Sequence, residues 1–121
     1  MKITFGFNPS IKKFESMFSA LPAEIKTGIK TALVKASFLV EGESKKITPV
    51  DTGRLRSSIF TTIYDKYATV EPKTNYAIFV HEGTKRMKGR PFMTNALDTS
   101  KEKITKIFGD EIENSLKKVL K

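Results

Sequence analysis

An Asp-Thr-Gly triplet is the part of the sequence that most resembles a catalytic motif. Asp51-Thr52-Gly53 follows Pro49-Val50, and aspartic proteases use such triplets in pairs, so that two carboxylates share one proton. The neighbouring residues argue against this chemistry, because the cation of Arg54 disfavours a shared proton and Pro49 interrupts a preceding strand. We therefore interpret residues 50–53 as a turn or a helix cap, and we keep a dimeric aspartic protease built on Asp51 as an alternative.

His81 and Glu82 form a second pair of side chains that could bind a metal or transfer protons. Neighbouring side chains diverge on both a strand and a helix, and the sequence has no second His and no Cys. The pair therefore indicates a structural or surface role, and we expect neither a metal nor a cofactor. The sequence also lacks a Gly-rich phosphate loop. Together these observations predict that the chain is not an enzyme.

Basic residues form the third candidate group. The 121 residues include 22 Lys and Arg against 13 Asp and Glu, a formal net charge of +9. The excess is spread along the chain, but residues 81–90 hold four bases and one acid. Such a cluster indicates contact with phosphate or with acidic protein. The candidate contact residues are Arg54, Arg56, Lys85, Arg86, Lys88 and Arg90.

Hydrophobic periodicity predicts the helices and an N-terminal strand. Alternating apolar residues predict a strand over residues 2–7, within an N-terminal strand or arm of residues 1–9. Apolar spacing predicts a helical region over residues 10–47, with a short first helix and a long second helix from Pro22 to Lys46. A further apolar stripe predicts a C-terminal helix over residues 91–121, begun by Pro91. Gly109-Asp110 leaves open whether that helix is continuous.

The middle of the chain, residues 48–90, is expected to hold a small sheet and a basic loop. β-branched and aromatic residues predict strands over residues 59–64 and 67–71. Residues 76–82 fit either a strand or a helical turn, and residues 84–89 indicate an exposed loop. The whole chain is expected to form one domain, residues 1–121. Its apolar stripes are covered either by core packing alone or by further copies of the chain.

Two expectations concern the location of the chain. No apolar run approaches the length that spans a membrane, so no membrane contact is expected. The first ten residues lack the apolar region of a signal peptide, which predicts synthesis and use in a cytoplasm.

Three segments, taken in order, are similar to one protein family. They are residues 48–59 (TPVDTGRLRSSI), 76–84 (YAIFVHEGT) and 89–97 (GRPFMTNAL), with a long helix expected on either side. Together they resemble the small tail-completion or head–tail joining proteins of long-tailed, double-stranded-DNA bacteriophages and prophages. The similarity covers about residues 10–120 and is most specific over residues 48–97.

The resemblance implies an α+β fold, with a long N-terminal helix and a long C-terminal helix packed on a small antiparallel β-sheet. It implies a structural protein of the virion, located at the head-proximal end of the tail or in the neck and made in the bacterial host cytoplasm. The implied assembly is an oligomeric ring, expected to contain six copies. The expected partners are further copies of the chain and other neck or tail proteins, with non-specific contact to transiting DNA. The net charge leaves a basic nucleic-acid-binding module as the alternative.

Architectural roles are expected for the motif residues Pro49, Asp51, Gly53, Ile59, Tyr76, Phe79, Gly83, Pro91 and Phe92. Pro49 ends the long helix, and Asp51 and Gly53 turn the chain into the sheet, where Ile59 anchors a strand. Tyr76 and Phe79, with Val80, are expected to pack inside. Gly83 lets the chain reverse, and Phe92 anchors the helix that Pro91 begins.

Overall fold

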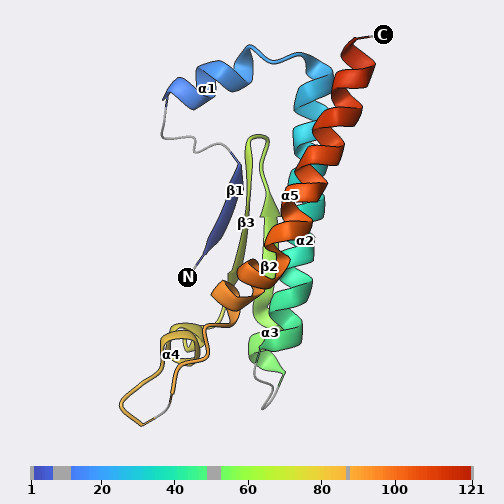
Figure 1. Ribbon diagram of the computed structural model, residues 1–121. Coiled ribbons are helices and arrows are strands. Elements are labelled where there is room, and N and C mark those ends of the chain that lie inside the picture. The colour runs from blue at the N-terminus through green and yellow to red at the C-terminus, as the bar shows by residue number, and fades with distance from the viewer. Residues whose placement is uncertain (1, 7–11, 49–52, 87, 121) are drawn as a thin grey trace.

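The fold is α+β, as expected, with two long helices packed beside a three-stranded antiparallel sheet (Figure 1). The computed structural model describes residues 2–6, 12–48, 53–86 and 88–120. Its elements are β1 (Ile3–Gly6), α1 (Lys12–Ser19), α2 (Ala23–Ile47), α3 (Arg54–Ser58), β2 (Ile59–Ile63), β3 (Tyr67–Pro72), α4 (Ala77–Glu82) and α5 (Phe92–Val119).

The sheet has the order β1-β3-β2, so the central strand is the last one in sequence. Val70 of β3 pairs with Ile3 on one side and with Thr61 on the other. Because directly paired residues share a face, the alternation within each strand separates an apolar face from a polar one. The apolar face packs against α2, where Val70 joins Val40 in the core. Thr4 and Thr69 pair on the opposite face.

The two long helices run antiparallel along each other, since Gly28 near the start of α2 lies against Ser115 near the end of α5. Helix α5 continues through Gly109-Asp110 without a break. A Cβ on Gly109 would have no neighbour within 4 Å, so this glycine costs the helix only its propensity, about 1 kcal/mol relative to Ala. Gly109 lies on the exposed side of α5 and does not break it, so the C-terminal helix is continuous.

Two groups of buried apolar side chains make up the core. The first joins the later half of α2, α3, the sheet, α4 and the start of α5, and includes Val40, Leu55, Ile59, Val70, Ala77, Phe92, Met93 and Ala96. The second lies toward the β2–β3 hairpin and includes Phe18, Ile25, Ile29, Leu33 and Ala68. Phe5 of β1 packs against both groups. The first group therefore holds α4 and the start of α5 against the body of the molecule.

One short helix was not predicted from the sequence, and another decides between two alternatives. Residues 54–58 form α3, where the sequence predicts only a turn leading to the strand at residue 59. Five residues are too short for a repeating apolar pattern, so periodicity does not find such a helix. Residues 77–82 form a helix, α4, which settles the ambiguity over residues 76–82 in favour of the helical turn.

Candidate partner-binding surface

Helix α4 leads into a hairpin whose described residues are 83–86 and 88–90, here called the basic finger. Figure 1 shows α4 and this hairpin projecting from the end of the molecule opposite to α1 and the β2–β3 hairpin. Gly83 ends α4 at φ 88°, and its N–H donates to the Phe79 carbonyl at 2.8 Å. This positive φ suits glycine, so Gly83 reverses the chain as the sequence predicts.

The base of the finger is held together by backbone contacts. Gly83 and Lys88 form an antiparallel bridge, and the Arg90 N–H donates to the Val80 carbonyl at 2.8 Å. A Cβ on Gly89 would lie 2.5 Å from the carbonyl carbon of Glu82 and 2.6 Å from its oxygen. The two strands of the finger therefore approach too closely for any residue but glycine at position 89.

The finger presents cations that form no ion pair with any described acidic residue. Lys85, Arg86, Lys88 and Arg90 are all exposed. The ion pairs within the described ranges use lysines of α2, of the β2–β3 turn and of α5 instead. The only acid among residues 77–90 is Glu82. Four cations on a backbone-braced hairpin therefore remain available for an anionic partner.

The two arginines of α3 lie beside the segment that leads into α4. The guanidinium carbon of Arg54 lies 5.7 Å from the centre of the Tyr76 ring, and the Lys73 N–H donates to the Ser58 carbonyl at 3.1 Å. Arg54 is exposed, but Arg56 is half-buried, and its Nε is buried without a hydrogen-bond partner in the described part of the chain. The six candidate contact residues thus gather at one end, and Arg56 is the least accessible of them.

Phe79 does not pack inside, which corrects the sequence expectation. Its side chain is 56% exposed and that of its neighbour Ile78 is 46% exposed. The reason is the helical conformation of α4, in which Tyr76 and Val80 stand four residues apart and share the face that packs on the core. Ile78 and Phe79 consequently face outward.

The structure also places the remaining motif residues. Ile59 at the start of β2 and Phe92 at the start of α5 are each 1% exposed. Pro91 immediately precedes α5, and Gly53 immediately precedes α3 with φ 76°. Pro49 and Asp51 lie outside the described residues, so their expected roles stay predictions.

The side chain of His81, near the end of α4, packs against the beginning of α5. Its ring packs edge-on against Phe92, with 5.6 Å between ring centres, and its Nε2 lies 3.3 Å from the Thr94 hydroxyl. Burial lowers the pKa of His81 below its ordinary value, and the nearby Glu82 carboxylate partly opposes this. Within the described ranges, no three His, Cys, Asp or Glu side chains are grouped so that they could hold a metal ion.

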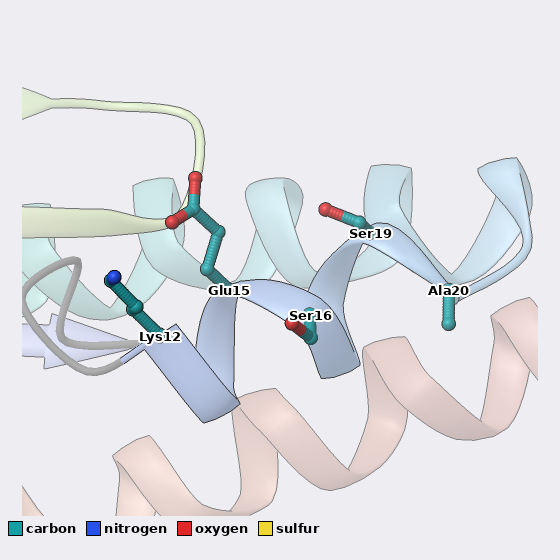
Figure 2. Close-up of a pocket in the computed structure, with 5 residues that line it drawn as sticks. All are labelled: Lys12, Glu15, Ser16, Ser19 and Ala20. Carbon is teal, nitrogen blue, oxygen red and sulfur yellow. The ribbon is translucent and has the colours of Figure 1, made fainter.

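A shallow depression lies along α1. Figure 2 shows its lining residues, Lys12, Glu15, Ser16, Ser19 and Ala20. They all come from one helix and its C-terminal end, and the Glu15 carboxylate is already paired with the Lys66 ammonium at 3.2 Å. This depression therefore brings together no set of groups for catalysis. No helix in the described ranges is long and apolar enough to cross a membrane.

Comparison with known proteins identifies a class of viral structural protein. The family model described as "Bacteriophage HK97-gp10, putative tail-component" matches residues 12–83, which is more than half of the chain. The chain belongs to this HK97-gp10-like family of phage tail components. No curated protein and no solved structure gave a match. The matched region runs from α1 to Gly83, so it ends where the basic finger begins.

Proposed function

We propose that the chain acts in tail completion or head–tail joining, as an oligomeric ring at the head-proximal end of the tail or in the neck. Membership of a phage tail-component family supports a structural role in the virion. The observation that carries the proposal is the concentration of unpaired cations on the projecting finger. A component that joins two parts of a particle needs such a surface for a neighbour of opposite charge. A structural role also favours a chain without enzymatic activity.

A second exposed surface supports assembly with further copies of the chain. Ile112, Leu116 and Val119 of α5 are 36%, 45% and 37% exposed. Their spacing of four and three residues places them along one side of the helix. A closed ring of identical subunits requires two different contact surfaces on each copy. The apolar stripe of α5 provides a candidate for one of them, and the expected ring has six copies.

The location is tested by examining purified phage particles. We expect the chain in purified virions, and immunogold labelling should place it between head and tail. A phage lacking the gene should accumulate separate heads and tails. A chain absent from purified particles, together with normal attachment of tails to heads without it, would contradict the proposal.

The ring is tested by its apolar surface. Changing Leu116 and Val119 to Lys should abolish the oligomer seen by cross-linking within particles, because charge replaces the apolar contact. Changing the exposed Lys106 and Lys118 of the same helix to Gln is the control and should leave the oligomer intact. An unchanged cross-linking pattern in the Leu116 and Val119 variant would show that this stripe is not a contact between copies.

Nucleic-acid binding is a second candidate function, favoured by the net charge of +9 and the unpaired cations. It predicts a duplex-DNA affinity that falls linearly on a double-logarithmic plot against salt, with a slope that reports the number of neutralised phosphates. A micromolar complex abolished at about 50 mM salt would indicate only a generic basic surface. The protease alternative predicts acid-range peptidase activity that Asp51→Asn removes, and the absence of such activity would dismiss it.

A further inference from the structure

The surface formed by α4 and the basic finger combines exposed apolar side chains with exposed cations. Ile78 and Phe79 are about half exposed on the outer side of α4. The finger continues directly from that helix and carries Lys85, Arg86 and Lys88. Exposed apolar side chains beside unpaired cations are typical of a protein contact surface, in which aromatic residues and Arg are enriched.

We propose that α4 and the basic finger form a single docking surface for an acidic protein face that has apolar side chains at its centre. This inference deepens the proposed function, on which it rests, by naming the chemistry of the neighbour in the particle. Phe79 and Ile78 are the apolar anchors. Lys85, Arg86 and Lys88 on the adjoining finger supply the positive charge, which steers the partner and sets the salt dependence of the association rate.

A protein partner fits these residues better than DNA does. A phosphate backbone is bound through cations and polar groups, and such a contact leaves the half-exposed Ile78 and Phe79 side chains unused. The exposed Glu82 carboxylate stands on the same helix, between Phe79 and the finger, and it repels phosphate and acidic side chains alike unless a donor faces it. An acidic protein face could bury the apolar pair and still provide a donor to Glu82.

A second copy of the chain is a poorer partner for this surface. The exposed stripe of α5, which could receive apolar side chains, has Lys117 and Lys118 beside Leu116 and Val119. Docking the basic finger there would bring cations against cations. The observations therefore favour a different protein with acidic residues around an apolar centre.

The test uses the full chain and three fluorescent probes in an anisotropy titration. One probe is a peptide in which Glu and Asp flank Leu and Phe, and the second is the same peptide with Ser in place of Leu and Phe. The third is a random-sequence DNA duplex. We expect the apolar acidic peptide to bind about tenfold more tightly than the Ser peptide, because only it fills the Ile78 and Phe79 contact.

Two pairs of variants locate the effect. Ile78→Ser with Phe79→Ser should abolish the tenfold preference, whereas Phe38→Ser, at a 50% exposed position on α2, should retain it. Reversing Lys85, Arg86 and Lys88 to Glu should weaken both peptides strongly. The same charge change at the exposed Lys101, Lys103 and Lys106 of α5 is the control, and it should weaken them much less. All the substituted side chains are exposed, so thermal unfolding should change little.

Equal affinity for the two peptides would overturn the proposal. The proposal would also be overturned if the DNA duplex bound more tightly than the peptides and Phe79→Ser weakened that binding. Such a result would mean that the apolar side chain inserts between base steps. Failure of the proposed function has a different signature, because the chain would then be missing from particles while the peptide preference remained. A chain present in particles without that preference would overturn the docking surface alone.

Discussion

Gly28 of α2 lies directly against Ser115 of α5. A Cβ on Gly28 would overlap the Ser115 hydroxyl and would lie 3.1 Å from the carbonyl oxygen of Glu111. That carbonyl accepts the Ser115 hydroxyl at 2.8 Å, and the Glu111 carboxylate pairs with Lys35 on α2. The contact between the two long helices is therefore close because position 28 has no side chain. The position of α5, and of the surface at its beginning, depends on this packing.

Gly28→Ala is predicted to destabilise the protein by about 1 kcal/mol. Overpacking against Ser115 costs roughly 1–3 kcal/mol, and the better helix propensity of Ala returns about 1 kcal/mol. Gly42→Ala and Gly109→Ala are matched controls, because a Cβ at either site has no neighbour within 4 Å. These controls should raise the free energy of unfolding by about 0.5–1 kcal/mol. Urea denaturation measures all three, and a stabilised Gly28→Ala would disprove the close contact.

Gly89→Ala is predicted to open the base of the basic finger. The new methyl group would meet backbone atoms of Glu82 and Gly83, which cannot rotate away. Amide hydrogen exchange should therefore speed up at Arg90 and Gly83, whose N–H groups bond within this region. Lys88→Ala removes a cation without this clash and is the control. Unchanged exchange at Arg90 in Gly89→Ala would contradict the braced hairpin.

Two phenylalanines separated by thirteen positions should respond differently to truncation. Phe92 is 1% exposed in the core and Phe79 is 56% exposed on α4. Phe92→Ala should lower the free energy of unfolding by about 3–5 kcal/mol, as expected for loss of a buried aromatic ring. Phe79→Ala should change it by less than about 0.5 kcal/mol. Similar losses for both variants would show that Phe79 packs inside after all.

The lowered pKa of His81 predicts that the stability of the protein depends on pH. Burial lowers its pKa in the folded protein from the ordinary value of 6.5, so the unfolded chain binds the proton more readily. The stability that neutral His81 contributes to the folded protein is fully present above pH 6.5. It is lost as the pH falls through the lowered pKa that His81 has in the folded protein. His81→Gln should flatten this part of the curve, measured by urea denaturation between about pH 5 and 7. A wild-type curve that rises as the pH falls through this range would contradict the prediction.

The sequence predicts the long elements because their apolar side chains repeat at a clear period. The helix from residue 22 and the helix after Pro91 have such patterns, and both are present. The two strands of the β2–β3 hairpin were predicted instead from their β-branched and aromatic residues, and they are present too. Helix α3 is too short to show a period. Hydrophobic periodicity also does not predict the close contact between α2 and α5. Gly28 and Ser115 are small or polar residues, and they matter because they let the two helices approach closely.

The candidate surface was only partly predictable. The cations of the finger stand out by composition, and they are indeed exposed. The exposed pair Ile78 and Phe79 does not stand out in the sequence. Tyr76, Ile78 and Val80 alternate as in a strand, and this pattern does not indicate that Phe79 lies on the outer side of a helix. Composition also could not reveal the base of the finger, which depends on the distance between Gly89 and the Glu82 backbone.

Localisation of the chain in the intact particle would be the most direct test of the proposed joining role. Cryo-electron microscopy of purified virions, with the chain fitted into the density, would show which neighbour meets α4 and the basic finger. We predict density for the chain at the head-proximal end of the tail or in the neck, arranged as a ring. Density at the distal tip of the tail, or none in the particle, would contradict the proposed role.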